Sequence, residues 1–119
     1  MKVSHELAHY LIDQLSPAWR FSARAMFGCT ALFHEGLMVL LITRQGEIYV
    51  KTDAVSQHRF AEAGCQPFTY TRRGPSGVRE VALSFSQLPE GVVEEQDELI
   101  SWVKPGIEAA RRAAAGDRL

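Results

Sequence analysis

Residues 26–51 read MFGCTALFHEGLMVLLITRQGEIYVK, and this segment sets the architecture expected of the whole chain. Its apolar runs are separated by short loops that contain glycine, at residues 34–36 and 44–46. Apolar, strand-forming runs that are joined in this way are typical of consecutive β-hairpins. The segment therefore predicts a three-stranded antiparallel meander, with strands over residues 23–33, 37–42 and 47–51.

The two later strands of this meander differ in their apolar pattern. Residues 37–42, LMVLLI, are apolar throughout, whereas residues 47–51, EIYVK, alternate charged or amphipathic side chains with apolar ones. Alternation indicates a strand with one wet face, and a continuous apolar run indicates a central strand that is covered on both faces. We expect helices on one side of strand 37–42 and a partner subunit on the other. Together with the unpaired edges of an open sheet, this predicts a homodimer.

Two helices are expected to pack on this sheet. In residues 4–15, leucine recurs every four positions and forms one apolar stripe. A second helix is predicted over residues 54–63, because Asp53 can cap its start and Gly64 supplies the left-handed position that ends it.

A third helix is predicted after Pro89. The acidic residues between Glu94 and Glu98 lie where a helix N-terminus favours negative charge. Pro105 lies inside the apolar stripe of this helix, directly before a glycine. Because proline removes a backbone hydrogen bond and clashes with the preceding turn, we expect a kink or two short helices there. The tail is expected to fray from about residue 115.

A second hairpin lies between the second and third helices. Residues 68–71 and 81–85 both alternate with a period of two, and the turn-forming sequence RGPSG at residues 73–77 lies between them. Arg72, Arg73 and Arg79 flank this loop. Three guanidinium groups on such a loop can grip phosphate or an acidic protein surface.

The composition is that of one globular domain over residues 1–119. The chain is 46% hydrophobic and 23% charged, which excludes a disordered or fibrous class. A formal net charge of −1 argues against direct nucleic-acid binding, because dedicated nucleic-acid binders usually carry a clear basic excess. Helices interleaved with antiparallel hairpins predict an α+β fold.

Nothing in the sequence directs the chain to a membrane or to export. Charged and polar residues interrupt the N-terminal apolar positions, and no apolar run approaches the roughly 20 residues needed to cross a bilayer. The two cysteines, Cys29 and Cys65, are too few and too far apart for a disulfide framework. We therefore expect a cytoplasmic protein with free thiols.

Six short segments resemble, in their order, the N-terminal domain of the TfoX/Sxy family. They are MFG at 26–28, LFHEGLM at 32–38, IYVK at 48–51, FAEAG at 60–64, PFTY at 67–70 and LPE at 88–90. The resemblance covers about residues 24–112 and implies an α-β(3)-α-β(2)-α two-layer fold, in agreement with the predicted element order. The motif residues are Met26, Phe27, Gly28, Gly36, Tyr49, Lys51, Phe60, Gly64, Phe68, Tyr70 and Pro89.

The resemblance also implies a function. The best-known members regulate natural competence in bacteria as coactivators that act with the cyclic-AMP receptor protein, and they carry a second, helical C-terminal domain. This chain is expected to be a stand-alone N-terminal module, a non-enzymatic regulator of transcription that binds another protein such as a transcription factor. Two alternatives stay open: direct nucleic-acid binding through the loop from Arg72 to Arg79, and an uncharacterised enzyme or small-molecule binder.

Other residues offer few sites. Tyr49 and Tyr70 are candidate exposed aromatic contacts, although cross-strand packing is the commoner use of tyrosine in a sheet. His5 and His9 have the spacing of two metal ligands on a helix but lack a third ligand in a recognised motif. Cys29, beside a glycine turn, is a reactive thiol only if a cation lowers its pKa. With no catalytic motif in the sequence, we expect no catalytic residues, no metal and no cofactor.

Overall fold

The computed structural model describes residues 3–26 and 28–116 of the chain. In these residues the elements are, in order, α1 (Val3–Leu15), β1 (Ser22–Met26), β2 (Cys29–His34), β3 (Leu37–Ile42), β4 (Ile48–Lys51), α2 (Gln57–Glu62), β5 (Pro67–Gly74), β6 (Gly77–Gln87), the short 3-10 helix η1 (Val92–Glu94) and α3 (Gln96–Gly116). None of the helices in this part of the chain has the length and apolarity that a membrane crossing requires.

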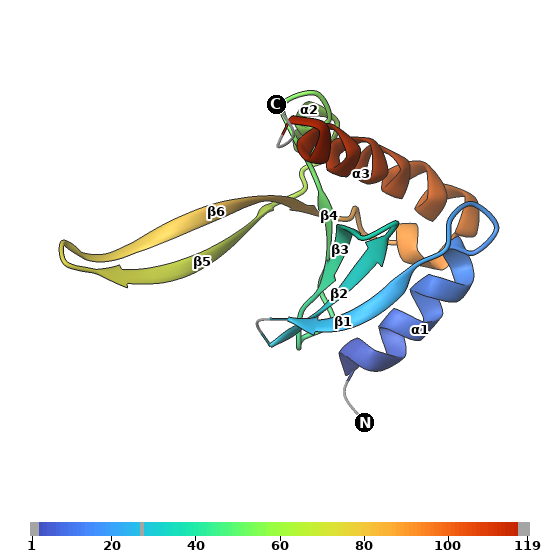
Figure 1. Ribbon diagram of the computed structural model, residues 1–119, viewed down its shortest axis with the longest axis horizontal. Helices are drawn as coiled ribbons and strands as arrows, with labels where there is room; N and C mark the ends of the chain where they lie inside the picture. The colour runs from blue at the N-terminus through green and yellow to red at the C-terminus, as the bar shows by residue number, and fades with distance from the viewer. Residues whose placement is uncertain (1–2, 27, 117–119) are drawn as a thin grey trace.

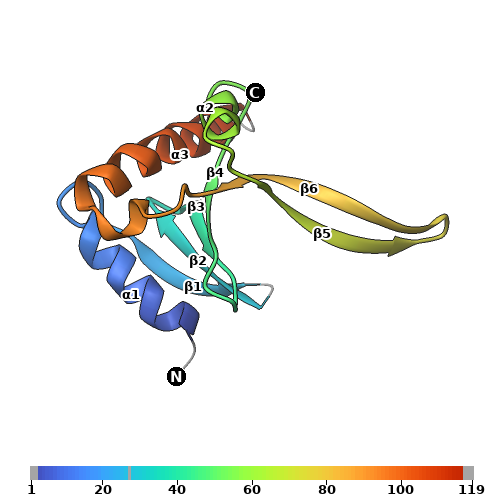
Figure 2. The same ribbon diagram turned by 180° about the vertical axis from the view of Figure 1, so that it is seen from behind.

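The strands form one antiparallel sheet in the order β1-β2-β3-β4-β6-β5. β6 joins the sheet beside β4, where Phe85 lies opposite Lys51, so the second hairpin extends the meander. Helices α1 and α3 lie on one face of β1 to β4, and the ribbon of β5 and β6 projects away on the opposite side (Figure 1). Figure 2 shows the same separation from behind. The predicted α+β class, with helices flanking an antiparallel sheet, is confirmed.

The meander has four strands and not the predicted three. Residues 23–33 form two strands, because the chain reverses between Met26 and Cys29, which lie opposite each other in the pair β1 and β2. Gly28 lies in this reversal with a φ of 76°, a conformation that favours glycine. The order α-β(3)-α-β(2)-α therefore becomes α-β(4)-α-β(2)-α. The reversal is inconspicuous in the sequence because a single glycine marks it.

The main core lies between the helices and one face of the sheet. Leu11 and Leu15 of α1, Leu99 and Val103 of α3, and Leu40 of β3 are all fully buried there. Burial of each such side chain is worth roughly 1.5–3 kcal/mol, because apolar surface leaves water. The stripe predicted for residues 4–15 is confirmed, and the helices cover only this face.

Helix α3 is one continuous helix of 21 residues with Pro105 inside it, so the predicted division into two short helices is wrong. One contact compensates for the proline, and the neighbouring glycine serves the packing of the helix. The Arg59 guanidinium donates a hydrogen bond of 3.0 Å to the Ser101 carbonyl oxygen, which receives no hydrogen bond from Pro105 because proline lacks an N–H. A Cβ atom on Gly106 would lie 2.5 Å from Val50 Cγ1, so glycine lets the helix approach the sheet closely.

The ends of α2 and α3 differ from the predicted bounds. Asp53 accepts the N–H groups of Val55 and Ser56 on Oδ1, both at 3.1 Å, as a capping carboxylate does, but the α-helix begins only at Gln57. Helix α3 reaches Gly116, past residue 115, where fraying was predicted. The rest of that tail, residues 117–119, lies outside the described residues.

Candidate functional site

The second hairpin forms a long two-stranded arm. Strand β5 has 8 residues and β6 has 11, more than the short strands predicted for this hairpin. Pairing continues to Gly74 opposite Gly77, so that only Pro75 and Ser76 form the turn. Every side chain of residues 71–80 is exposed. Because neither face of the outer arm is buried, it needs no apolar alternation, and the sequence signal for a strand is lost there.

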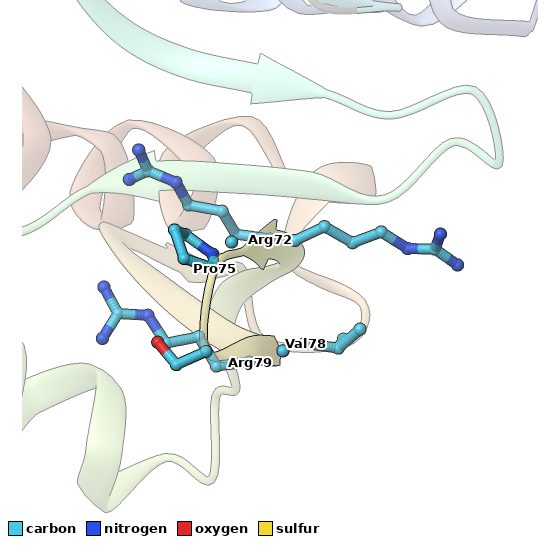
Figure 3. A pocket seen from close by; sticks show the side chains of 8 residues that line it. Arg72, Pro75, Val78 and Arg79 are labelled. Carbon is cyan, nitrogen blue, oxygen red and sulfur yellow. The ribbon is translucent and has the colours of Figure 1, made fainter.

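The predicted candidates Arg72, Arg73 and Arg79 lie together at the end of the arm, and we call them the basic tip. Arg72 lies opposite Arg79, and Arg73 lies opposite Val78. Successive side chains of a strand alternate between its two faces, so Arg72 and Arg79 share one side of the ribbon and Arg73 lies on the other. Figure 3 shows Arg72 and Arg79 pointing to one side and Val78 to the opposite side, around a hollow of about 370 Å³.

The basic tip has the chemistry of an anion-binding surface. Each guanidinium presents a planar fork of donors that matches the oxygens of phosphate or carboxylate. Residues 71–80 contain one acidic side chain, Glu80, and neither histidine nor cysteine. Among the ion pairs of the described residues, none involves the basic tip. Its positive charges are therefore available to a ligand.

The sheet face opposite α1 and α3 carries a second apolar cluster, which we call the open face. Its members are buried Ala31, Leu41, Tyr49 and Phe85, with half-buried Met26, Cys29, Phe33, Met38 and Phe68 around them. All of these described residues belong to strands. The Arg24 guanidinium lies 5.1 Å from the ring centre of Phe33, and the Lys51 ammonium lies 5.5 Å from that of Phe85. The open face is thus a buried apolar cluster under half-buried side chains, with two cations beside its rings.

Tyr49 lies at the centre of the open face and is not an exposed contact. Tyr49 is only 8% exposed, and its ring packs edge-on against Phe68 with 4.9 Å between ring centres. Burial, with a smaller effect of Glu47, raises the pKa of its hydroxyl. Tyr49 is therefore not the exposed side chain that was expected, because its ring packs across the strands. The side chain of Tyr70 lies outside the described residues.

Sequence reasoning missed the surface positions of Phe33, Met38 and Phe68. Strands β2 and β3 are apolar on both faces, so their sequence does not say which face the helices cover. A signal was present in Arg24 and Lys51, because a cation within an otherwise apolar meander marks the face without a helix.

The cysteine and histidine candidates do not assemble into a site. Burial raises the pKa of the Cys29 thiol despite the opposing charge of Arg44, and burial also raises the pKa of Cys65. His5 and His9 line a hollow of about 200 Å³ between α1 and β1. Within residues 3–26 and 28–116, no three or more metal-ligating side chains converge.

The remaining motif residues have structural positions. Gly28, Gly36 and Gly64 have φ values of 76°, 79° and 77°, and the value at Gly64 confirms the predicted left-handed end of α2. Phe60 is fully buried in the main core. Phe27 lies outside the described residues. The described motif residues of this paragraph therefore have roles in the fold, in turns and in the core.

Comparison with known proteins agrees with this fold. The family model described as the TfoX N-terminal domain matches residues 13–110. The chain is 29% identical over 92 residues to DNA transformation protein TfoX1 of Aliivibrio fischeri. That match covers 77% of this chain and 42% of the relative, so the chain spans less than half the length of TfoX1. Because the family match runs from within α1 to within α3, the chain belongs to the TfoX N-terminal domain family.

Proposed function

We propose that this chain is a non-enzymatic interaction module that acts in DNA transformation by binding another protein. The name of its relative, DNA transformation protein TfoX1, supports a role in DNA transformation. The open face supports the mode of action. We place the module in the cytoplasm, as a coactivator of transcription whose partner is a transcription factor.

One observation carries this proposal: the apolar cluster of the open face is built from strand residues alone and is ringed by half-buried side chains. A sheet face that no helix covers, with half-buried apolar side chains at its surface, suits contact with another protein. Arg24 and Lys51 lie on this surface, above the rings of Phe33 and Phe85. A matching partner supplies apolar side chains together with carboxylates.

The test is to capture partners from the source cell and then to measure the affinity of the captured transcription factor for two variants. Arg24→Glu reverses a charge on the open face, and we expect it to weaken binding about tenfold or more, which is about 1.4 kcal/mol. Val55→Glu is the control, because Val55 is 60% exposed and lies outside the open face. Equal affinity of both variants, together with unchanged gene expression when the gene is deleted, would contradict the proposal.

A second copy of the chain is the other occupant that suits the open face, and the homodimer stays a prediction. Light scattering of the purified chain tests it. A dimer that Arg24→Glu converts to a monomer would assign the open face to self-association. A monomer at high concentration would leave the open face to a different protein.

A further inference from the structure

The net charge of −1 conceals an excess of positive charge on the strands. The charged side chains of the described strands, apart from histidine, are Arg24, Lys51, Arg72, Arg73, Arg79 and Glu80. Helix α1, by contrast, contains Glu6 and Asp13 and neither lysine nor arginine. Positive charge thus gathers on the sheet and arm, so a net charge near zero does not argue against a polyanionic ligand.

The shape of the arm narrows the class of polyanion. The arm is a two-stranded antiparallel ribbon that projects away from the helices (Figure 1). The major groove of duplex DNA, about 12 Å wide, admits such a ribbon. Arg72 and Arg79 on one side of the ribbon and Arg73 on the other can each reach a phosphate wall of the groove.

Single-stranded nucleic acid suits the arm less well. Proteins that bind single strands stack the bases on exposed aromatic rings. Residues 71–80 contain no aromatic side chain; nearer the base of the arm, Phe85 is only 5% exposed and half-buried Phe68 packs against Tyr49. The outer arm therefore offers charge and shape but no ring on which a base could stack.

We propose that the arm enters the major groove of duplex DNA and that the basic tip binds phosphates on both walls of the groove. Phosphate contacts position a protein on the duplex without reading its sequence, so this binding is independent of sequence. The basic tip and the open face have no residue in common. The DNA contact and the protein contact can therefore be tested separately, and neither depends on the other.

Fluorescence anisotropy with a labelled duplex of mixed sequence measures this binding. With three phosphate contacts, the slope of log K against log salt is about −2.7, so affinity is expected to fall roughly 40-fold between 50 and 200 mM salt. The double variant Arg72→Ala/Arg79→Ala is expected to bind about tenfold more weakly or worse at low salt, with a slope near −0.9. Arg72→Lys/Arg79→Lys keeps the charges and should retain most of the affinity.

A matched control removes the same charge elsewhere. Arg20 and Lys104 are exposed and lie outside the arm, and Arg20→Ala/Lys104→Ala should bind the duplex as the unaltered chain does. Circular dichroism and chemical unfolding of each variant check that it folds, because exposed substitutions usually change stability by about 0.5 kcal/mol or less.

Four results would overturn the proposal. They are no binding of the duplex at low salt, equal losses in the two alanine double variants, equal or tighter binding of the single strand of the same sequence, and equal or tighter binding of polyglutamate. The last result would assign the basic tip to an acidic protein surface.

Discussion

The Arg59 guanidinium donates a hydrogen bond of 3.0 Å to the carbonyl oxygen of Ser101, and a second one of 3.0 Å to its hydroxyl oxygen. This carbonyl is the acceptor that residue 105 would serve in an ordinary helix. Arg59 also lies 4.0 Å above the ring centre of Trp102. A side chain of α2 thus completes the hydrogen bonding of α3 where Pro105 cannot.

We therefore expect Arg59→Ala to lower the free energy of unfolding by about 0.5–1.5 kcal/mol, because it removes an exposed hydrogen bond to a helix carbonyl that water can partly replace. Chemical denaturation measures this loss. The variant Pro105→Ala restores an N–H at position 105, so Arg59→Ala should cost less in that background. The same cost in both backgrounds would show that the hydrogen bond to Ser101 is not what stabilises the pair of helices.

Gly106 should not tolerate alanine. In an exposed helix, glycine to alanine adds about 1 kcal/mol of stability. At Gly106 the new Cβ would lie 2.5 Å from Val50 Cγ1 and 3.2 Å from Val39 Cγ1, so we expect a loss of about 1–3 kcal/mol in chemical denaturation. Gly116→Ala is the control, because its added Cβ would meet no described atom beyond its chain neighbours and its own helix turn. A neutral Gly106→Ala would mean that α3 can move away from the sheet freely.

The ion pair of Asp53 with Arg112 should make stability depend on acid pH. The Arg112 guanidinium contacts both carboxylate oxygens, at 2.6 and 3.0 Å, and lowers the pKa of Asp53 from 3.8 to about 2. A carboxyl whose pKa is lower in the folded state stabilises the fold above its ordinary pKa, and this contribution disappears as pH falls from about 4 towards 2.

Because both side chains are partly exposed, we expect this contribution to be about 1 kcal/mol or less. Unfolding free energies measured across that pH range for the unaltered chain and for Asp53→Asn check it, and the variant should lack this part of the pH dependence. Glu62→Gln serves as a control, since Glu62 takes part in none of the ion pairs of the described residues.

The two thiols should react slowly. Burial raises the pKa of Cys29 and of Cys65, so the thiolate fraction at neutral pH is below that of free cysteine. Titration with a chromogenic disulfide should show slow modification of both in the folded chain and rapid modification in denaturant. The single variants Cys29→Ser and Cys65→Ser assign each rate. A fast Cys29 would revive the reactive-thiol hypothesis.

The sequence predicts those parts of the fold whose signal is local. The leucine stripe of α1 and the left-handed glycine that ends α2 are examples, because periodicity and backbone freedom act within a few residues. It fails for α3, because the contact that accommodates Pro105 comes from Arg59, which is distant in the chain. It also fails at the hairpin between Met26 and Cys29, where one glycine within an apolar run is a weak turn signal.

The candidate site is predictable to the same extent. Turn chemistry locates Arg72, Arg73 and Arg79 beside a hairpin loop, and the structure places them together. The length of the arm cannot be predicted from the sequence, because its outer part is exposed on both faces and lacks apolar alternation. The excess of positive charge on the strands is also hidden, because a whole-chain sum adds the basic strands to the acidic α1 and to the acidic residues of the loops.

The arm also bears on how such a domain can diversify. No described side chain of residues 71–80 belongs to either apolar cluster. Substitutions in residues 71–80 should therefore have little effect on folding, and selection on them acts through what the basic tip binds. The binding specificity of the arm can therefore change during evolution while the rest of the domain keeps its fold.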